Sequence, residues 1–308
     1  MCTPKEIAEN YLSACRTKAA LPLGRMFLLA CLAGAFVALA GVASTAAAAT
    51  VGDPSLAKLS SGCVFPAGLA MVIVAGSELF TGNNLMIMGV LARTITVRQM
   101  LRNWLVVYLG NFAGAVLVVA LCVSGHVFSA FGGKLAASVV TIAQTKAGLS
   151  FGDAFVRGIL CNFLVCIAVW MANAARTVGG KIAAVFFPIM AFVVACFEHS
   201  VANMYYLAAG LFTAGQTGAA AEGLTWGRAL AGNLLPVTLG NLVGGENLGL
   251  DVGVVDRVGE ALSRYVVNGQ QDLNALLLGL CKHIPAVVDL GLVNERGADR
   301  AALCSEEG

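Results

Sequence analysis

Three long stretches without a charged side chain constrain this chain more than any other feature. Residues 26–52, 103–133 and 158–175 contain no Asp, Glu, Lys or Arg. Each stretch is long enough to cross about 30 Å of hydrocarbon as a helix. Charged residues make up only 12% of the chain and hydrophobic residues 58%, about half the charged fraction of an ordinary soluble domain. The sequence therefore predicts an all-α integral membrane protein, and a soluble enzyme of this length is not expected.

The lengths of the apolar runs predict six membrane spans. They cover residues 26–49, 64–91, 103–131, 154–175, 182–211 and 229–250. The segment 1–25 is predicted to be an N-terminal amphipathic segment on the cytoplasmic face, with a weak apolar stripe of Ile7, Tyr11 and Leu12. The six spans together are predicted to form one membrane domain over residues 26–250. The charged residues that follow predict a cytoplasmic C-terminal tail over 251–308, with helices near 252–266 and 270–282.

The distribution of Lys and Arg between the connections predicts the orientation. The N-terminal segment and the second and fourth connections are basic, whereas the alternate connections hold only Lys58, then Lys134 and Lys146, then Arg228. By the positive-inside rule, both termini lie in the cytoplasm and the protein is multi-pass in the cytoplasmic (inner) membrane. The net charge of +2 leaves no basic surplus for binding nucleic acid.

A short motif occurs twice. Residues 109–114 read L-G-N-F-A-G and residues 239–244 read L-G-N-L-V-G, in the third and sixth predicted spans. Three spans per copy place the second copy in the membrane with the opposite orientation, which is an inverted 3+3 repeat. In such proteins the substrate path lies where the two copies meet, beside broken helices.

The second and fifth spans, the middle span of each copy, are the interrupted ones. The second contains Ser77-Glu78-Leu79-Phe80-Thr81-Gly82-Asn83-Asn84, and the fifth contains Phe197-Glu198-His199-Ser200. Non-helical backbone at membrane depth is tolerated only where protein or water satisfies its polar groups, so we expect both helices to be broken there. Two plainer interpretations stay open: residues 77–84 as an aqueous loop, and the Glu198–His199 pair as a structural clamp.

These residues carry a family resemblance. The segments 77–84, 102–115, 157–172, 197–204 and 233–245 resemble the signature segments of the formate/nitrite transporter family. The resemblance implies an aquaporin-like fold, a homopentamer with one pore in each protomer, and a channel for small monovalent anions (formate, nitrite or hydrosulfide). Residues 77–84 are somewhat more similar to nitrite- and hydrosulfide-type members. Beyond Gly245 the sequence departs from the family pattern, because Glu246 and several later charges replace apolar residues.

Position by position, the resemblance implies two groups of site residues. The first group narrows the pore: Phe65, Leu69 and Phe192 toward one vestibule, Leu79 and Phe80 toward the other, and Val165 in the pore lining. The second group handles the anion or its proton: His199, Thr81, Lys146, Glu198, Asn162 and Asn241. Thr81 is expected to face His199, Lys146 to attract the anion, and Thr81 and Asn162 to hydrogen-bond the substrate or the imidazole.

The resulting hypothesis is that His199 donates or relays a proton, so that a weak acid crosses the apolar constrictions as a neutral molecule. An aquaporin-like channel for neutral small solutes is the alternative, although the paired Asn-Pro-Ala boxes are missing. A membrane hydrolase built on Glu198, His199 and Ser200 is disfavoured because adjacent helical residues point about 100° apart. No cofactor or metal is expected, since the cysteines form no CxxC pair and the three histidines lie far apart.

Overall fold

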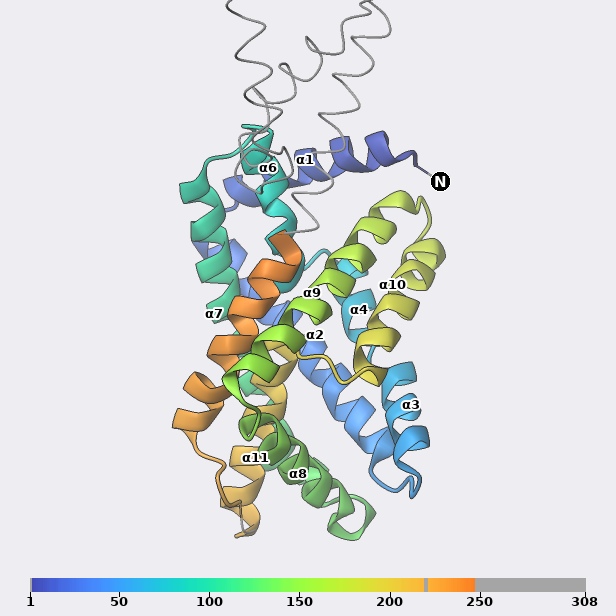
Figure 1. The fold of residues 1–308 in the computed structure, drawn as a ribbon, viewed down its shortest axis with the longest axis vertical. Helices are drawn as coiled ribbons and strands as arrows, with labels where there is room; N and C mark the ends of the chain where they lie inside the picture. Colours follow the sequence, from blue (N-terminus) through green and yellow to red (C-terminus); the bar gives the residue numbers. More distant parts are fainter. Residues whose placement is uncertain (1, 219–220, 247–308) are drawn as a thin grey trace, which may run out of the picture. The chain divides into compact units, whose positions relative to one another are not determined.

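The protein is helical throughout the residues that the structure describes. The structure is a computed structural model, and it describes residues 2–218 and 221–246. The first half of the sequence forms α1 (Pro4–Ala20), α2 (Leu23–Ala48), α3 (Pro54–Val64), α4 (Ala67–Ala75), α5 (Phe80–Asn83), η1 (Asn84–Met86), α6 (Ile87–Leu91) and α7 (Val97–Ser124) (Figure 1). The second half forms η2 (Val127–Ser129), η3 (Phe131–Gly133), α8 (Lys134–Ala147), α9 (Phe151–Ala174), α10 (Val178–Val194) and α11 (Ser200–Thr217). A last helix covers residues 226–246 and contains a π-helical segment, Arg228–Leu234.

Four of these helical stretches are long and apolar enough to cross a membrane: Leu23–Ala48, Pro54–Ala75, Val97–Ser124 and Phe151–Ala174. Large apolar side chains point outward from them and from α10, with exposed fractions of 67% for Leu28, 62% for Leu105, 63% for Leu121 and 67% for Phe187. An exterior of this kind is stable in hydrocarbon, where the usual rule of apolar inside and polar outside does not apply. Membrane lipid is therefore the expected neighbour of these faces.

Two predicted span limits differ most from the structure. The second span begins at Pro54 and not at residue 64, because α3 carries Lys58 within a helix that is otherwise apolar enough to span. The third span ends at Ser124 and not at residue 131. His126 adopts a left-handed backbone conformation there, with φ of 56°. The following helix α8 was not predicted, and residues 247–250 of the sixth span lie outside the described residues.

Both middle spans are broken, as the sequence predicts, and both breaks begin with the same turn. A residue in the left-handed conformation follows the helix, Gly76 with φ of 69° after α4 and Cys196 with φ of 58° after α10. The next N–H then donates back into the last helical turn, from Ser77 to Val72 O (3.0 Å) and from Phe197 to Phe192 O (3.0 Å). This is the hydrogen-bond pattern of a Schellman cap. Residues 77–84 are therefore neither a continuous helix nor an aqueous loop, since they are buried from Ser77 to Asn84.

The repeated motif marks the closest helix crossings. Gly110 and Gly114 place α7 directly on α2, where a Cβ on Gly114 would overlap the carbonyl oxygen of Cys31. Gly240 and Gly244 bring the last helix equally close to the carbonyls of α9. Glycine is required here by close backbone approach, as in other packed membrane helices.

We expect Gly114→Ala to destabilise the protein by about 1–3 kcal/mol, because an added methyl group must push α2 and α7 apart. The check is the thermal unfolding temperature of the detergent-solubilised protein. Gly24→Ala at the start of α2 is the matched control, since no atom lies within 4 Å of its added Cβ. Equal losses in the two variants would show that the crossing is not the cause.

The N-terminal segment forms helix α1, which lies at the end of the bundle near α6 (Figure 1). Thr3 and Glu6 cap its start reciprocally, and backbone hydrogen bonding from Thr3 keeps the pKa of Glu6 below its ordinary value. Its buried face includes the predicted Ile7 and Tyr11, with Cys15 and Ala19 in place of the half-buried Leu12. Burial raises the pKa of the Cys15 thiol to about 11. The chain divides into Met1–Gly249 and Leu250–Gly308, and the predictions for the tail, including its two helices, fall outside the described residues.

Candidate functional site

The two breaks meet at a threonine and a histidine. Thr81 lies on α5, directly after the first break, and His199 is the residue that precedes α11, directly after the second. Thr81 Oγ1 lies 2.8 Å from His199 Nε2, and both side chains are buried. The contact expected from the resemblance is therefore present, between residues far apart in sequence.

The hydrogen bonds of the imidazole show which of its two nitrogens carries the proton. His199 Nδ1 accepts a hydrogen bond from the backbone N–H of Ala202 at 3.0 Å, which caps α11. A nitrogen that accepts carries no proton, so the proton of the neutral ring is on Nε2 and is donated to Thr81 Oγ1. The Thr81 hydroxyl hydrogen is then free to be donated to another group. A second proton on the ring requires that the Ala202 bond be broken.

Glu198 stands in a closed polar network beside this contact. Lys146 Nζ lies 2.9 and 3.0 Å from its two carboxylate oxygens, and Asn203 donates to one of them at 2.6 Å. Asn203 also donates to Asn233 Oδ1 (2.7 Å), and Asn233 donates to Lys146 O (2.8 Å). A buried carboxylate needs such partners, because an unpaired one costs several kcal/mol. Lys146 is thus bound to Glu198 and comes from the end of α8.

The first half of the chain contains a closely similar network. Lys18 Nζ lies 2.8 Å from Glu78 Oε1, and Asn83 donates to Glu78 Oε2 at 2.7 Å and to Asn103 Oδ1 at 2.8 Å. Each residue is the counterpart of one in the second half: Lys18 of Lys146, Glu78 of Glu198, Asn83 of Asn203, and Asn103 of Asn233. None of Lys18, Glu78, Asn83 and Asn103 was predicted as a site residue, although Glu78 and Asn83 were placed in the first break. Alignment of the two copies at the L-G-N motif, 130 residues apart, matches Asn103 with Asn233, whereas the glutamates and the other asparagine pair lie 120 residues apart and match only with a gap.

The asparagine of the repeated motif holds each break in place. Asn241 Oδ1 accepts from Ser200 N–H (2.8 Å), and its amide donates to Gly158 O (2.8 Å) and Glu198 O (3.0 Å). Asn111 makes the equivalent three bonds in the first half, to Phe80 N, Ala30 O and Glu78 O, at 2.9, 2.8 and 2.9 Å. Asn241 therefore acts on the backbone of the break and satisfies groups that a broken helix leaves unpaired.

Asn162 does not contact the imidazole. Its amide donates to Asn241 O at 2.7 Å and to Thr81 O at 3.3 Å. Asn162 therefore contacts the backbone of Thr81 and not the hydroxyl that faces His199. Neither Asn162 nor Val165 lines either of the two cavities described next, although both are buried. Of the two partners expected for Asn162, the imidazole receives no hydrogen bond because the amide donates to the two backbone carbonyls; hydrogen bonding to the substrate stays a prediction.

Two cavities adjoin the breaks, one on each side. The Glu78 vestibule has a volume of about 210 Å³, and its lining includes Lys18, Leu69, Glu78, Leu79 and Lys181. The second cavity has a volume of about 80 Å³, and its lining includes Lys58, Phe65, Lys146, Phe192, His199 and Tyr206. It is called the Glu198 vestibule after the carboxylate that binds its Lys146, although Glu198 itself does not line it. Both cavities are therefore narrow spaces that combine apolar side chains with lysines.

The apolar side chains are arranged differently from the expectation at two positions. Phe65 and Phe192 do meet edge to face, with ring centroids 5.8 Å apart, and Phe192 stacks on the His199 ring at 5.8 Å. Leu69, however, lines the Glu78 vestibule with Leu79, one turn of helix away from Phe65. Phe80 lines neither vestibule, because its ring packs against Tyr108 with centroids 4.9 Å apart.

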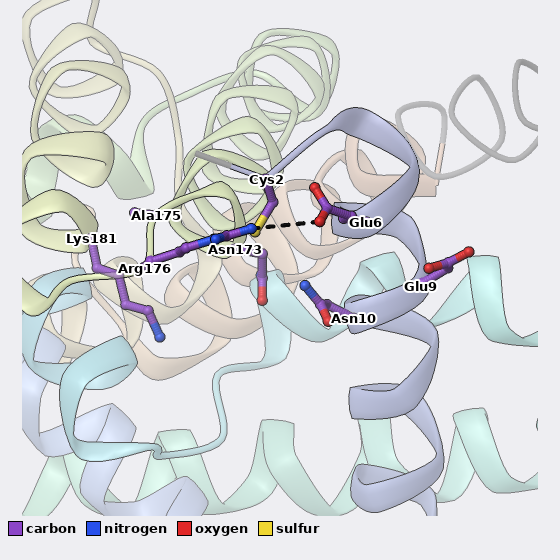
Figure 2. Close-up of a pocket in the computed structure, with 8 residues that line it drawn as sticks. All are labelled: Cys2, Glu6, Glu9, Asn10, Asn173, Ala175, Arg176 and Lys181. Carbon is purple, nitrogen blue, oxygen red and sulfur yellow. Dashed lines mark ion pairs between the residues drawn. The ribbon is translucent and has the colours of Figure 1, made fainter.

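A third, more open cavity lies beside the N-terminal segment and was not predicted. Its volume is about 580 Å³, and it is lined by Cys2, Glu6, Glu9, Asn10, Asn173, Ala175, Arg176 and Lys181 (Figure 2). Arg176 reaches across it to Glu6, with 3.5 Å between Nη2 and Oε1, while Lys181 lies apart from this pair. Asn173 and Lys181 also line the Glu78 vestibule, so the outer cavity adjoins it.

Comparison with known proteins identifies the family of this chain. The family model described as "Formate/nitrite transporter" matches residues 5–252. The chain belongs to the formate/nitrite transporter family. It is 39% identical over 263 residues to a "Probable formate transporter" of Methanothermobacter thermautotrophicus, covering 79% of this chain and 92% of that protein. It is 40% identical over 239 residues to "Formate channel FocA" of Haemophilus influenzae, covering 73% and 83%.

Solved structures agree with this family assignment. An "FNT family ion channel" superposes with a TM-score of 0.70 at 35% identity, covering 80% of this chain and 96% of that one. A "Pentameric formate channel with formate bound" superposes with a TM-score of 0.66 at 34% identity, covering 75% and 94%. This formate/nitrite transporter is therefore an all-helical, multi-pass membrane channel protein and not an enzyme. The family resemblance and the prediction of an all-helical membrane protein with several apolar spans are confirmed, and the hydrolase alternative is wrong.

Proposed function

We propose that this formate/nitrite transporter conducts small monovalent anions of weak acids across the cytoplasmic membrane. The proposal includes six spans in an inverted 3+3 repeat of aquaporin-like form, one pore per protomer in a homopentamer, and both termini in the cytoplasm. The observation that carries it is the Thr81–His199 contact, which joins two buried breaks between vestibules that are both lined by lysines. The four paired positions in the Glu78 and Glu198 networks support the repeat.

Formate is the first anion to test. Several relatives at 37–40% identity bear names of formate channels, which favours formate over the nitrite or hydrosulfide suggested by residues 77–84. A channel for neutral solutes is less well supported, because such a pore does not need a lysine in each vestibule.

Energetics explain why a proton is needed. Moving an isolated charge through an apolar constriction costs tens of kcal/mol by the idealised estimate. Protonating an acid with a pKa of about 4 at pH 7 costs only about 4 kcal/mol, at roughly 1.4 kcal/mol per pKa unit. An anion that is held near Lys146 or Lys18 and then protonated can therefore pass Phe65 and Phe192, or Leu69 and Leu79, as a neutral acid.

In this scheme Thr81 and His199 form a polar binding site for the substrate between the two constrictions. The Nε2–H of neutral His199 and the Thr81 hydroxyl are the donors that can bind an oxygen of the substrate. Donation or relay of a proton by His199 requires a ring protonated on both nitrogens, which in turn costs the Ala202 hydrogen bond. The ring therefore binds the extra proton transiently, when an anion is present to stabilise it.

Replacing His199 with Asn tests this role. Asparagine is a good N-cap and can accept the Ala202 N–H, so we expect the protein to fold and α11 to start at the same residue. The rise of formate flux with falling pH should become several-fold shallower in proteoliposomes, because Asn cannot carry a proton. Flux identical to the wild type at every pH would show that His199 relays no proton.

A further inference from the structure

Each vestibule contains one lysine whose charge is cancelled. Lys146 contacts both oxygens of Glu198, and Lys18 contacts Glu78 at 2.8 Å. The electric fields of a cation and an anion so close together nearly cancel at distances greater than the separation of the two charges. These pairs can hold an anion that touches the ammonium group, but they cannot attract one over a distance.

Lys58 is the second lysine of the Glu198 vestibule, and its charge is not cancelled. It lies half-buried on α3 and lines this cavity with Lys146 and Tyr206. No acidic side chain lines the cavity, and among residues 2–218 and 221–246 no ion pair involves Lys58. The net positive charge of this vestibule therefore comes from Lys58.

Lys181 occupies the corresponding place in the Glu78 vestibule. It lies in the first two turns of α10, as Lys58 lies in the first two turns of α3, and each helix opens an interrupted span. Lys181 forms no ion pair within the described part of the chain. Of the two carboxylates that line the adjoining outer cavity, Glu6 is paired with Arg176, which leaves Glu9 as the one opposing charge there.

We propose that Lys58 and Lys181 collect the substrate anion from solution, each for its own vestibule. This role rests on the proposed function. It assigns different roles to the two kinds of lysine: Lys58 and Lys181 attract the anion from a distance, and Lys146 and Lys18 hold it beside the constriction. Charges that line a cleft with apolar walls raise the local concentration of counter-ions and the rate of association, by 10-fold or more in strong cases. Salt removes this effect, since the Debye length falls from about 30 Å at 0.01 M to about 3 Å at 1 M.

The test is formate uptake by proteoliposomes that contain the full chain, at both ionic strengths. The double variant Lys58→Gln/Lys181→Gln alters both vestibules, so the orientation of the protein in the vesicle does not matter. We expect uptake about threefold slower than the wild type at about 0.01 M salt and equal to it at about 1 M. The arginine double variant, Lys58→Arg/Lys181→Arg, should restore the wild-type rate.

Lys5→Gln/Lys134→Gln is the matched control, because it removes the same charge from exposed lysines that line none of the three cavities. It should leave uptake unchanged at both ionic strengths. Wild-type uptake by the Lys58/Lys181 glutamine variant at low salt would overturn the proposed role, and so would a loss of equal size at high salt. A wild-type protein that takes up no formate, nitrite or hydrosulfide would instead contradict the proposed function.

Discussion

Replacing Asn241 by leucine is expected to abolish formate flux and to lower the free energy of unfolding by at least about 3 kcal/mol. The substitution leaves two buried backbone groups of the break without a partner, Ser200 N–H and the carbonyl of Glu198, and removes a second hydrogen bond from the carbonyl of Gly158 in α9. Each unsatisfied buried group costs about 1–3 kcal/mol. The second break would then lose the geometry that presents His199 to Thr81. Thermal unfolding in detergent and flux in proteoliposomes measure the two effects.

Asn173→Leu is the control for stability. The Asn173 amide donates only to a carbonyl of its own helix, Val169 O at 2.8 Å, so we expect a change within about 0.5 kcal/mol for a substitution of this kind. An Asn241→Leu protein as stable as the wild type would show that this amide does not hold the break.

Removing Lys146 should have the second large effect. Lys146→Met leaves the Glu198 carboxylate buried without its counter-ion, and breaking a buried pair costs about 3–5 kcal/mol. In the double variant Lys146→Met/Glu198→Gln the carboxylate charge is gone as well, so we expect most of the lost stability to return. Flux should stay about tenfold below the wild type, since a loss of about 1.4 kcal/mol of anion stabilisation corresponds to a factor of ten.

Salt distinguishes this variant from those at Lys58 and Lys181. Lys146 acts on an anion within contact distance, which salt screens little, so the loss should be the same at low and high ionic strength. Wild-type flux in the double variant would show that Lys146 serves only to neutralise Glu198.

The breaks were predictable because charge in an apolar run is expensive. Glu78 with the asparagines that follow it, and Glu198 with His199, cannot lie in a continuous lipid-facing helix, and these polar groups placed both interruptions. The repeated Gly residues predicted related halves, and close backbone contact explains them. The predicted start of the second span was wrong because of Lys58. A lysine that lines an internal cavity cannot be told from sequence alone from a lysine that ends an apolar run.

The partners of the buried carboxylates were not predictable from local sequence. Nothing near Lys18 shows that its side chain reaches Glu78, because the contact depends on how α1 packs against the first break. The expected bond from Asn162 to the imidazole is absent for a similar reason, since carbonyls of two other helices, Asn241 O and Thr81 O, accept from its amide. The left-handed residue of the second break is Cys196 and not glycine, a conformation that L-residues adopt at a cost of roughly 1–2 kcal/mol. Glycine is the usual residue at such a helix end, as Gly76 is in the first break, so Cys196 gives no sequence signal for the second.

The most direct test of the central claim, that the transported species crosses as a neutral acid, is formate uptake under an imposed membrane potential with the internal pH recorded. Neutral-acid passage predicts that each formate carries one proton inward and that a potential of either sign leaves the initial rate unchanged. Uptake that follows the sign of the potential, with no change in internal pH, would mean that the bare anion crosses both constrictions, and would contradict the account.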